Sequence, residues 1–281
     1  GLAAAHEAWK VVLLDVVDET WMAQAERDLL REHGAARLLA APGEEPAVAE
    51  GRDEDPAKER SEAVSTTADE TAPDISASVS RLEERAQQIE TRAGVPCQVV
   101  VAAGESDAAG TVLETAARAD CDLIAVPYEE RHGSLSPFVR ALFGGRVDVL
   151  VHRSHAGRTR WSRAMVPVRR ASDVAHTMMD FATRLVGMTG RVSACSCIAS
   201  DRQRRRADDM LEDLVETFTG NLETRVARAD IQNFLAENAP DYDIVFIGAS
   251  QDRSAASRLI SPPTFERIQD IEVDVAIVDR N

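Results

Sequence analysis

The chain has 281 residues, of which 44% are hydrophobic and 4% are aromatic, so aliphatic side chains must build its core. This hydrophobic content excludes disorder along the whole chain, and the length favours two domains over one. The net charge of −16 makes nucleic acid and anionic membrane surfaces poor partners, because both require a basic face.

The basic residues are almost all arginine, since Lys10 and Lys58 are the only lysines among 32 Lys and Arg residues. An acidic, lysine-poor composition is typical of proteins from salt-loving archaea, where high salt screens the repulsion between surface charges. We therefore expect a halophilic source. No stretch approaches the roughly 20 apolar residues of a membrane span and no signal peptide opens the chain, so we expect a cytoplasmic location.

The first part of the chain reads as a series of strands and helices. Continuous apolar runs predict strands covered on both faces, and apolar residues at helical spacing predict helices. The predicted elements are a strand at 10–17, a helix at 78–94, a strand at 97–103, a helix at 108–119 and strands at 123–126 and 147–151.

The start of this series is incomplete. Residues 1–9, "GLAAAHEAW", read as the end of a helix, and no first strand precedes Trp9. A first strand is central in a doubly wound sheet. We therefore expect either that this strand lies upstream of Gly1 in a longer protein or that another segment takes its place.

Residues 43–75 interrupt the series with 11 acidic and 3 basic residues, among many Pro, Gly, Ser and Glu. This composition predicts a solvated, disordered insertion, because the segment has too few apolar residues to bury. An acidic interaction arm is the alternative.

The second part of the chain alternates strictly between strands and helices, which predicts a parallel, doubly wound α/β sheet. The strands are expected at 163–168, 191–199, 223–229, 244–249 and 273–278, and the helices at 172–188, 207–220, 231–238 and 263–269.

An internal repeat divides the chain. Residues 121–153 and 242–280 share one plan: an Asp, a buried strand, a Ser-bearing loop, a short helix, and a final strand that begins with Val-Asp-Val. We therefore expect two tandem α/β domains, at 1–155 and 160–281, with the acidic insertion in the first.

This plan resembles the universal stress protein family. The resemblance rests on "AMVPVRRASDVAHTMMDFATRL", "CDLIAVPY" with "VDVLVHR", and "YDIVFIGASQDRSAASRLI" with "VDVAIVDR", and covers the chain apart from the insertion. Some members of that family bind ATP through an Asp at the end of the first strand and a loop of the form Gly-x-x-Gly, nine residues, Gly-Ser/Thr. Glycines in such loops let main-chain N–H groups approach the phosphates closely.

The first glycine of the loop survives as Gly248, but the sequence departs from the pattern at the other key positions. Arg169 stands in place of the Asp, Gln251 in place of the second glycine, and Ile260 in place of the distal glycine. We therefore expect no nucleotide cofactor, with ATP or AMP binding as the alternative. The candidate residues of this degenerate nucleotide or anion site are Val168, Arg169, Gly248, Ser250 and Ser261 in the second half and Gly133, Ser134 and Gly144 in the first.

Other reactive side chains carry weaker signals. The four cysteines, Cys97, Cys121, Cys195 and Cys197, lie in or beside apolar runs and are expected to be core residues in a reducing compartment. His132, His152 and His155 lack further ligands at metal-binding spacing, and no catalytic Ser-His-Asp arrangement is legible. The basic run at 201–209 is expected to form ion pairs at the start of a helix, with docking of an acidic partner as the alternative.

These observations favour a non-enzymatic regulatory or stress-response module, with a nucleotide-dependent switch as the alternative. The resemblance implies that the last strands, 147–151 and 273–278, pair edge to edge, either as an internal pseudo-dimer or in self-association. In salt-loving archaea such tandem domains also occur as the cytoplasmic regulatory region of amino-acid or cation transporters, and this is a second expected context.

Overall fold

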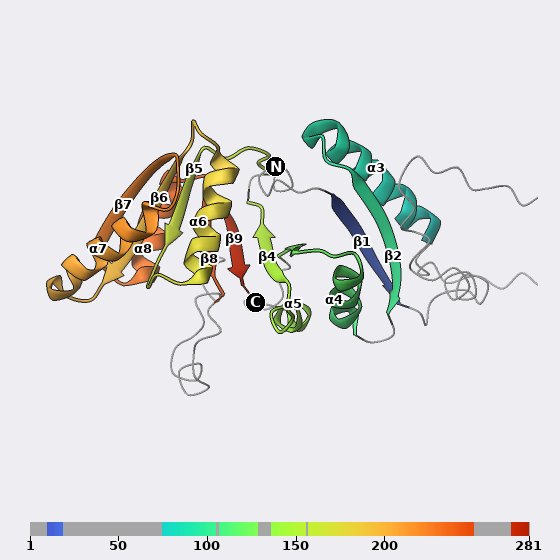
Figure 1. Cartoon of the computed structure of the whole chain (residues 1–281), viewed down its shortest axis with the longest axis horizontal. Helices are drawn as coiled ribbons and strands as arrows, with labels where there is room; N and C mark the ends of the chain where they lie inside the picture. Colours follow the sequence, from blue (N-terminus) through green and yellow to red (C-terminus); the bar gives the residue numbers. More distant parts are fainter. Residues whose placement is uncertain are drawn as a thin grey trace, which may run out of the picture. The chain divides into compact units, whose positions relative to one another are not determined.

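The computed structural model describes residues 10–18, 75–104, 107–128, 136–155, 157–249 and 271–280. The chain divides into two compact units. The smaller unit is built from β1 (Val11–Asp18), α3 (Ile75–Ala93) and β2 (Cys97–Gly104), and the main unit holds the elements from α4 to β9 (Figure 1).

In the smaller unit β1 and β2 form a two-stranded parallel sheet, in register from Val11 opposite Cys97 to Asp18 opposite Gly104. Helix α3 lies along this pair (Figure 1), and Arg81 of the helix forms an ion pair with Asp15 of β1 at 2.8 Å. The pairing buries the middle of β2. The strands expected at 10–17 and 97–103 and the helix expected at 78–94 are therefore confirmed.

The main unit contains a seven-stranded sheet in the order β3-β4-β9-β8-β5-β6-β7. Its strands are β3 (Leu123–Pro127), β4 (Asp148–Arg153), β5 (Arg163–Pro167), β6 (Arg191–Ile198), β7 (Asn221–Arg228), β8 (Ile244–Gly248) and β9 (Asp274–Asp279). Its helices are α4 (Ala108–Arg118), α5 (Pro137–Leu142), α6 (Asp173–Val186), α7 (Arg204–Val215) and α8 (Ile231–Asn238), with short 3₁₀ turns η2 (Asp201–Gln203) and η3 (Ala239–Asp241). The mostly parallel α/β fold class is confirmed.

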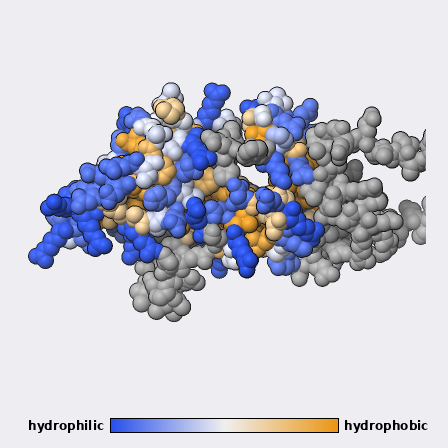
Figure 2. All heavy atoms as spheres, in the orientation of Figure 1, coloured by the Kyte–Doolittle hydropathy of each residue, from blue (hydrophilic) through white to orange (hydrophobic). Residues whose placement is uncertain are grey.

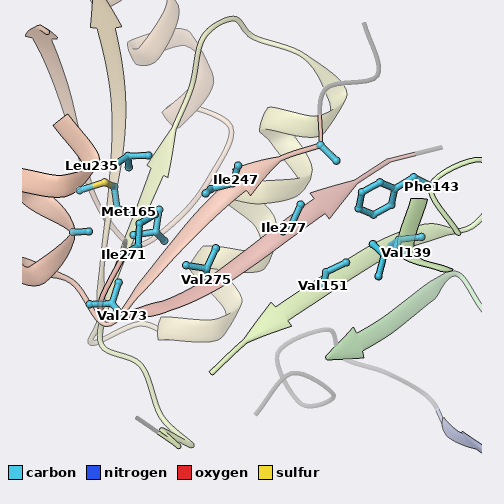
Figure 3. Close-up of a cluster of buried hydrophobic side chains, with 14 of the residues drawn as sticks. Val139, Phe143, Val151, Met165, Leu235, Ile247, Ile271, Val273, Val275 and Ile277 are labelled. Carbon is cyan, nitrogen blue, oxygen red and sulfur yellow. The ribbon is translucent and has the colours of Figure 1, made fainter. Parts of the chain in front are cut away.

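The two faces of this sheet carry separate apolar clusters, because successive residues of a strand point to opposite faces. On one face, α6 and α7 bury side chains that include Met178, Met179, Phe181, Leu211 and Leu214 against β5, β6 and β8. On the other face, α4, α5 and α8 cover the alternate strand residues, which include Val151, Met165, Val275 and Ile277 (Figure 3). Each fully buried aliphatic side chain contributes about 1.5–3 kcal/mol.

Each half of the internal repeat contains one parallel strand pair, β3 with β4 or β8 with β9, and the two pairs have the same register. Leu123 of β3 pairs with Asp148 of β4, and Ile244 of β8 pairs with Asp274 of β9, so each pair aligns the start of its two strands in the same way. Both pairs are parallel. The sequence repeat is thus also a structural repeat.

Strands β4 and β9 join the two halves and are the one antiparallel pair in the described part of this sheet. Val151 lies opposite Ile277, which is its own counterpart in the repeat. The other pairs are Val149 with Asp279, Leu150 with Val278, His152 with Ala276 and Arg153 with Val275. These pairs exchange counterparts around the Val151–Ile277 pair, as a two-fold axis requires.

Helix α7 differs from its predicted bounds of 207–220. The oxygen Oε1 of Gln203 accepts from the main-chain N–H groups of Ala199 (3.0 Å) and Ser200 (3.3 Å), which starts a helical turn at Asp201. The arginines of the basic run therefore lie in helical turns, not ahead of them. The helix ends at Val215, before Gly220, which takes a positive φ of 133° in the turn to β7.

Asp243 fixes the connection between the two halves to the start of β5. Its Oδ2 accepts from Ser162 N (2.8 Å), Ser162 Oγ (2.8 Å) and Arg163 N (3.0 Å), and its Oδ1 accepts from Arg158 at 2.9 Å. Burial by itself would raise the pKa of this carboxyl, but the hydrogen bonds from Ser162 and Arg163, with the charge of Arg158, outweigh burial and lower the pKa. The ionised carboxylate is therefore the form that stabilises the fold.

Replacing Asp243 by Asn is expected to lower the free energy of unfolding at pH 7 by about 1–3 kcal/mol, because charged hydrogen bonds are lost. Since the folded pKa is depressed, this stability is fully present above the unfolded pKa of about 3.9 and is lost as pH falls through the folded pKa. Urea unfolding at several pH values measures the difference. Asp241→Asn, at an exposed position nearby, is the control. A difference between wild type and Asp243→Asn that stays constant down to acid pH would contradict this role.

Candidate functional site

The carboxyl ends of β5 and β8 are the natural ligand position in the main unit. In open α/β sheets, ligands bind outside these ends where successive crossovers diverge, and here β5 lies between β8 and β6. The structure brings Val168, Arg169 and Gly248 to this edge, because they end or follow these two neighbouring strands. Ser250 and Ser261 lie outside the described residues.

Val168 continues the sheet beyond the end of β5. Its side chain is buried, and its main-chain N–H donates to Cys195 O at 2.6 Å. This N–H is therefore used within the sheet. Arg169 follows it and is exposed, so a cationic side chain stands where the ATP-binding pattern has an Asp.

Gly248 packs against α6. A Cβ at this position would lie 3.0 Å from Val174 Cγ1 and 3.5 Å from Met178 Cε. The distance to Val174 is tighter than most Cβ contacts, and the distance to Met178 is an ordinary van der Waals contact. The glycine therefore allows α6 to pack closely on β8, a role that is independent of any phosphate.

The helices that start at this edge are capped by residues of the chain itself. Ser172 Oγ accepts from Ala175 N at the start of α6, and Asp230 Oδ2 accepts from Gln232 N at the start of α8. The turn that leads into α7 is closed by Gln203. Capping groups occupy N–H donors that an anion would otherwise use, and a carboxylate at a helix start repels one.

The corresponding residues of the first half do not join this site. Because β4 and β9 are antiparallel, the carboxyl ends of β3 and β4 lie at the opposite edge of the sheet from those of β5 and β8. Gly133 and Ser134 lie outside the described residues. Gly144 is exposed and follows the C-terminal end of α5, where the helix dipole is negative, so an anion is disfavoured there.

A group of arginines lies at the start of α7. Arg202, Arg204, Arg205 and Arg206 are exposed, and Figure 2 shows hydrophilic residues gathered over this end of the main unit. Arg204 donates to Val226 O at 3.1 Å. Asp201 forms an ion pair with Arg228 at 3.1 Å, as expected for ion pairing at the start of a helix.

The buried carboxylate of Asp274 organises the histidine-containing segment after β4. It accepts from Trp161 Nε1 (2.8 Å) and His155 N (2.7 Å), while His152 Nε2 lies 3.7 Å away. Burial lowers the pKa of His152 despite the opposite pull of Asp274. His132 lies outside the described residues, and the part of the chain that the structure describes contains no cluster of three potential metal ligands.

Of the two cysteines of β6, Cys195 is buried in the core, and Cys197 is partly buried and packs against it. Burial raises the pKa of the Cys195 thiol to about 12 and that of Cys197 to about 11. All four cysteines are free thiols. Because the thiolate is the reactive form of cysteine, the raised pKa values leave little of that form at neutral pH.

Comparisons with solved structures find the same fold in universal stress proteins. A universal stress protein from Archaeoglobus fulgidus is similar with a TM-score of 0.53 and 16% identity, over 74% of this chain and 78% of that chain. A proposed universal stress protein from Pseudomonas aeruginosa UCBPP-PA14 is similar with a TM-score of 0.54 and 15% identity, over 98% of this chain and 94% of that chain. The chain has the universal stress protein fold.

A functionally unknown protein from Pseudomonas aeruginosa PAO1 gives a similar result, with a TM-score of 0.51 and 13% identity over 98% of this chain and 94% of that chain. No protein-family model and no curated protein sequence matches the chain. At these identities the universal stress protein fold is what the likeness shows. No helix within the described ranges is long and apolar enough to cross a bilayer.

The sequence analysis did not predict the side chains that cap the helices at the carboxyl ends of the strands. Ser172 and Asp230 each directly precede an apolar helical run, which is the ordinary sequence signal for an N-cap. That signal was present in the sequence. The packing of Gly248 against Val174 has no such signal, because it depends on how closely α6 approaches β8.

Replacing Gly248 by Ala is expected to destabilise the fold by about 1–3 kcal/mol, because the new methyl group overpacks the contact with Val174. Adding Val174→Ala should recover part of that loss. Gly144→Ala is the control, since its Cβ would meet only Ala141 O, at 3.4 Å. Thermal and urea unfolding measure all four proteins. If Gly248→Ala is as stable as wild type, Gly248 is not a packing residue.

Cys195 and Cys197 are expected to resist thiol reagents in the folded protein at pH 8, because their raised pKa values leave little thiolate. Site-resolved mass spectrometry after timed labelling measures this. The same residues should react readily in urea. Rapid labelling of either residue under native conditions would contradict the burial of these thiols.

Proposed function

We propose that this chain is a non-enzymatic regulatory module of the universal stress protein type whose nucleotide site has degenerated. The observation that carries this proposal is the use of Gly248 in packing against α6. This is the one glycine retained from the phosphate-binding pattern in the second half. Its contact with Val174 supports a role in the fold in place of a role in ligand binding.

The charges at the same edge support the proposal. Arg169 stands where the ATP-binding pattern has an Asp, while Asp173 and Asp230 are at the starts of α6 and α8. A triphosphate would therefore meet carboxylates at two helix N-termini that are already capped. The signal of such a module is carried by contacts with other macromolecules and not by the chemistry of a bound nucleotide.

Isothermal titration with ATP, ADP and AMP in high salt tests this proposal. We expect no binding with a Kd in the micromolar range. Arg169→Asp restores the acidic residue and should also fail to bind, because packing at Gly248 and the helix caps are unchanged. Thermal unfolding of both proteins in the same buffer shows that the samples are folded.

Micromolar binding of any of these nucleotides by the wild-type chain would overturn the proposal. The result would favour the alternative of a nucleotide-dependent switch. Binding by Arg169→Asp alone would show that a single charge had silenced an otherwise intact site, which would also contradict the role assigned to Gly248.

A further inference from the structure

The charges of α7 are arranged against the dipole of the helix. Its first turn has arginine at each of residues 204–206 and no acidic residue, while its last turn has Glu212 and Asp213 and no basic residue. The N-terminal end of a helix is electrically positive and the C-terminal end is negative, so both ends of α7 carry the sign of charge that destabilises a helix. The 3₁₀ turn ahead of α7 adds another arginine, Arg202.

The other helices of the main unit do not share this arrangement. Helices α4, α5 and α6 each have an arginine in the last turn, namely Arg118, Arg140 and Arg184. Helix α6 also has Asp173 in its first turn, and α8 has Asp230 at its N-cap. Helix α7 is therefore the one described helix of the main unit whose charges oppose its dipole at both ends.

Neighbouring groups leave most of this positive charge uncompensated. Asp201, the carboxylate next to the arginines, already pairs with Arg228 at 3.1 Å. Arg204 donates to Val226 O at 3.1 Å. Within the ranges that the structure describes, three arginines have no hydrogen bond or ion pair: Arg202, Arg205 and Arg206.

These three arginines, which we call the arginine face, share one side of α7. Arg202 precedes Arg205 by three residues and Arg206 by four, the spacings at which side chains are neighbours on a helix and like charges repel. All three are exposed, while the other side of the helix buries Leu211 and Leu214 in the core. The helix lies beside the edge strand β7, at one end of the main unit (Figure 1). Repulsion and the helix dipole both favour a bound anionic group here.

The surroundings of the arginine face favour a short anionic partner over a long one. Exposed carboxylates follow within the next two turns of the helix, at Asp209, Glu212 and Asp213. A nucleic acid strand would extend past the arginines to these carboxylates, and the net charge of −16 would repel it further. A short segment of polypeptide can place a few carboxylates on the arginines alone. Carboxylates also accept paired, charge-assisted hydrogen bonds from guanidinium groups.

We propose that the arginine face is a docking surface for a short segment of a partner protein that is rich in Asp and Glu. Carboxylates of that segment accept hydrogen bonds from Arg202, Arg205 and Arg206 and place negative charge at the start of α7, where the helix dipole favours it. This inference goes beyond the function proposed above and does not depend on it, because it holds whether or not the chain binds a nucleotide.

The probe is an octapeptide of alternating Glu and Asp with a fluorescent label, and anisotropy of the label measures its binding to the full chain. We expect saturable binding in about 0.1 M salt and progressive loss of affinity as added salt screens the charges. The matching octapeptide of Gln and Asn should not bind. The combined change Arg202→Gln, Arg205→Gln and Arg206→Gln, here the triple-Gln variant, should weaken binding at least about tenfold, because the charged donors are lost.

The matched control replaces three arginines of other elements by Gln. Arg85, Arg146 and Arg160 are exposed and, within the described part of the chain, have no hydrogen bond or ion pair. The control variant loses the same three charges as the triple-Gln variant but keeps the arginine face. Its affinity for the acidic octapeptide should therefore change less than about twofold, since isolated surface charges interact weakly.

Thermal unfolding distinguishes docking from a structural role. Gln has nearly the helix propensity of Arg, and its neutral side chain removes the unfavourable charges at the start of α7. The triple-Gln variant should therefore unfold at the same temperature as the wild-type chain or at a higher one. Arginines that held the fold together through ion pairs would give the opposite shift.

Four results would overturn the proposal. The first is no binding of the acidic octapeptide by the full chain, and the second is an equal loss of affinity in the triple-Gln and control variants. The third is tighter binding of an oligonucleotide of equal charge than of the octapeptide, which would assign the arginine face to nucleic acid. The fourth is a triple-Gln variant that unfolds at a lower temperature than both the wild-type chain and the control variant.

Discussion

The antiparallel pairing of β4 with β9 is the interaction on which the rest of the main unit depends. These two strands lie side by side where the two halves of the repeat meet in the sheet. Their side chains belong to both apolar clusters, one on each face of the sheet. Val151 and Ile277 are buried opposite each other at the pseudo-two-fold axis. Every other strand of the sheet is positioned, directly or through a neighbour, by this pair.

The same pairing determines where function can lie. Because one half runs against the other, the ligand-binding ends of the two halves face opposite edges and cannot form one shared site. At the carboxyl ends of β5 and β8, the described groups already contact other parts of the chain. Gly248 packs on a helix, Val168 donates within the sheet, and Ser172 caps α6. The universal stress protein fold is retained, and these described groups serve the stability of the fold.

Much of this fold was predictable from the sequence. The apolar runs at 244–249 and 273–278 predicted buried strands, and the spacing of Met178, Ala182 and their neighbours predicted the apolar face of α6, because these patterns reflect burial directly. The start of α7 was misjudged because one side chain, Gln203, begins the helical turn early. The role of Gly248 was beyond prediction, since the sequence does not encode the distance between a strand and the helix that covers it. Ser250 and Ser261 lie outside the described residues, so their proposed roles stay predictions.

The two halves of the repeat carry different side chains next to the pseudo-two-fold axis. His152 lies opposite Ala276, whereas its counterpart Val278 lies opposite Leu150. Two copies of β4 placed together in this register would set each imidazole against a leucine, whereas the pairing with β9 sets it against an alanine. The side chains that meet at the axis therefore differ from those of a pairing between two identical strands. Because both strands belong to one chain, β4 has β9 available at a high effective concentration that does not depend on the protein concentration.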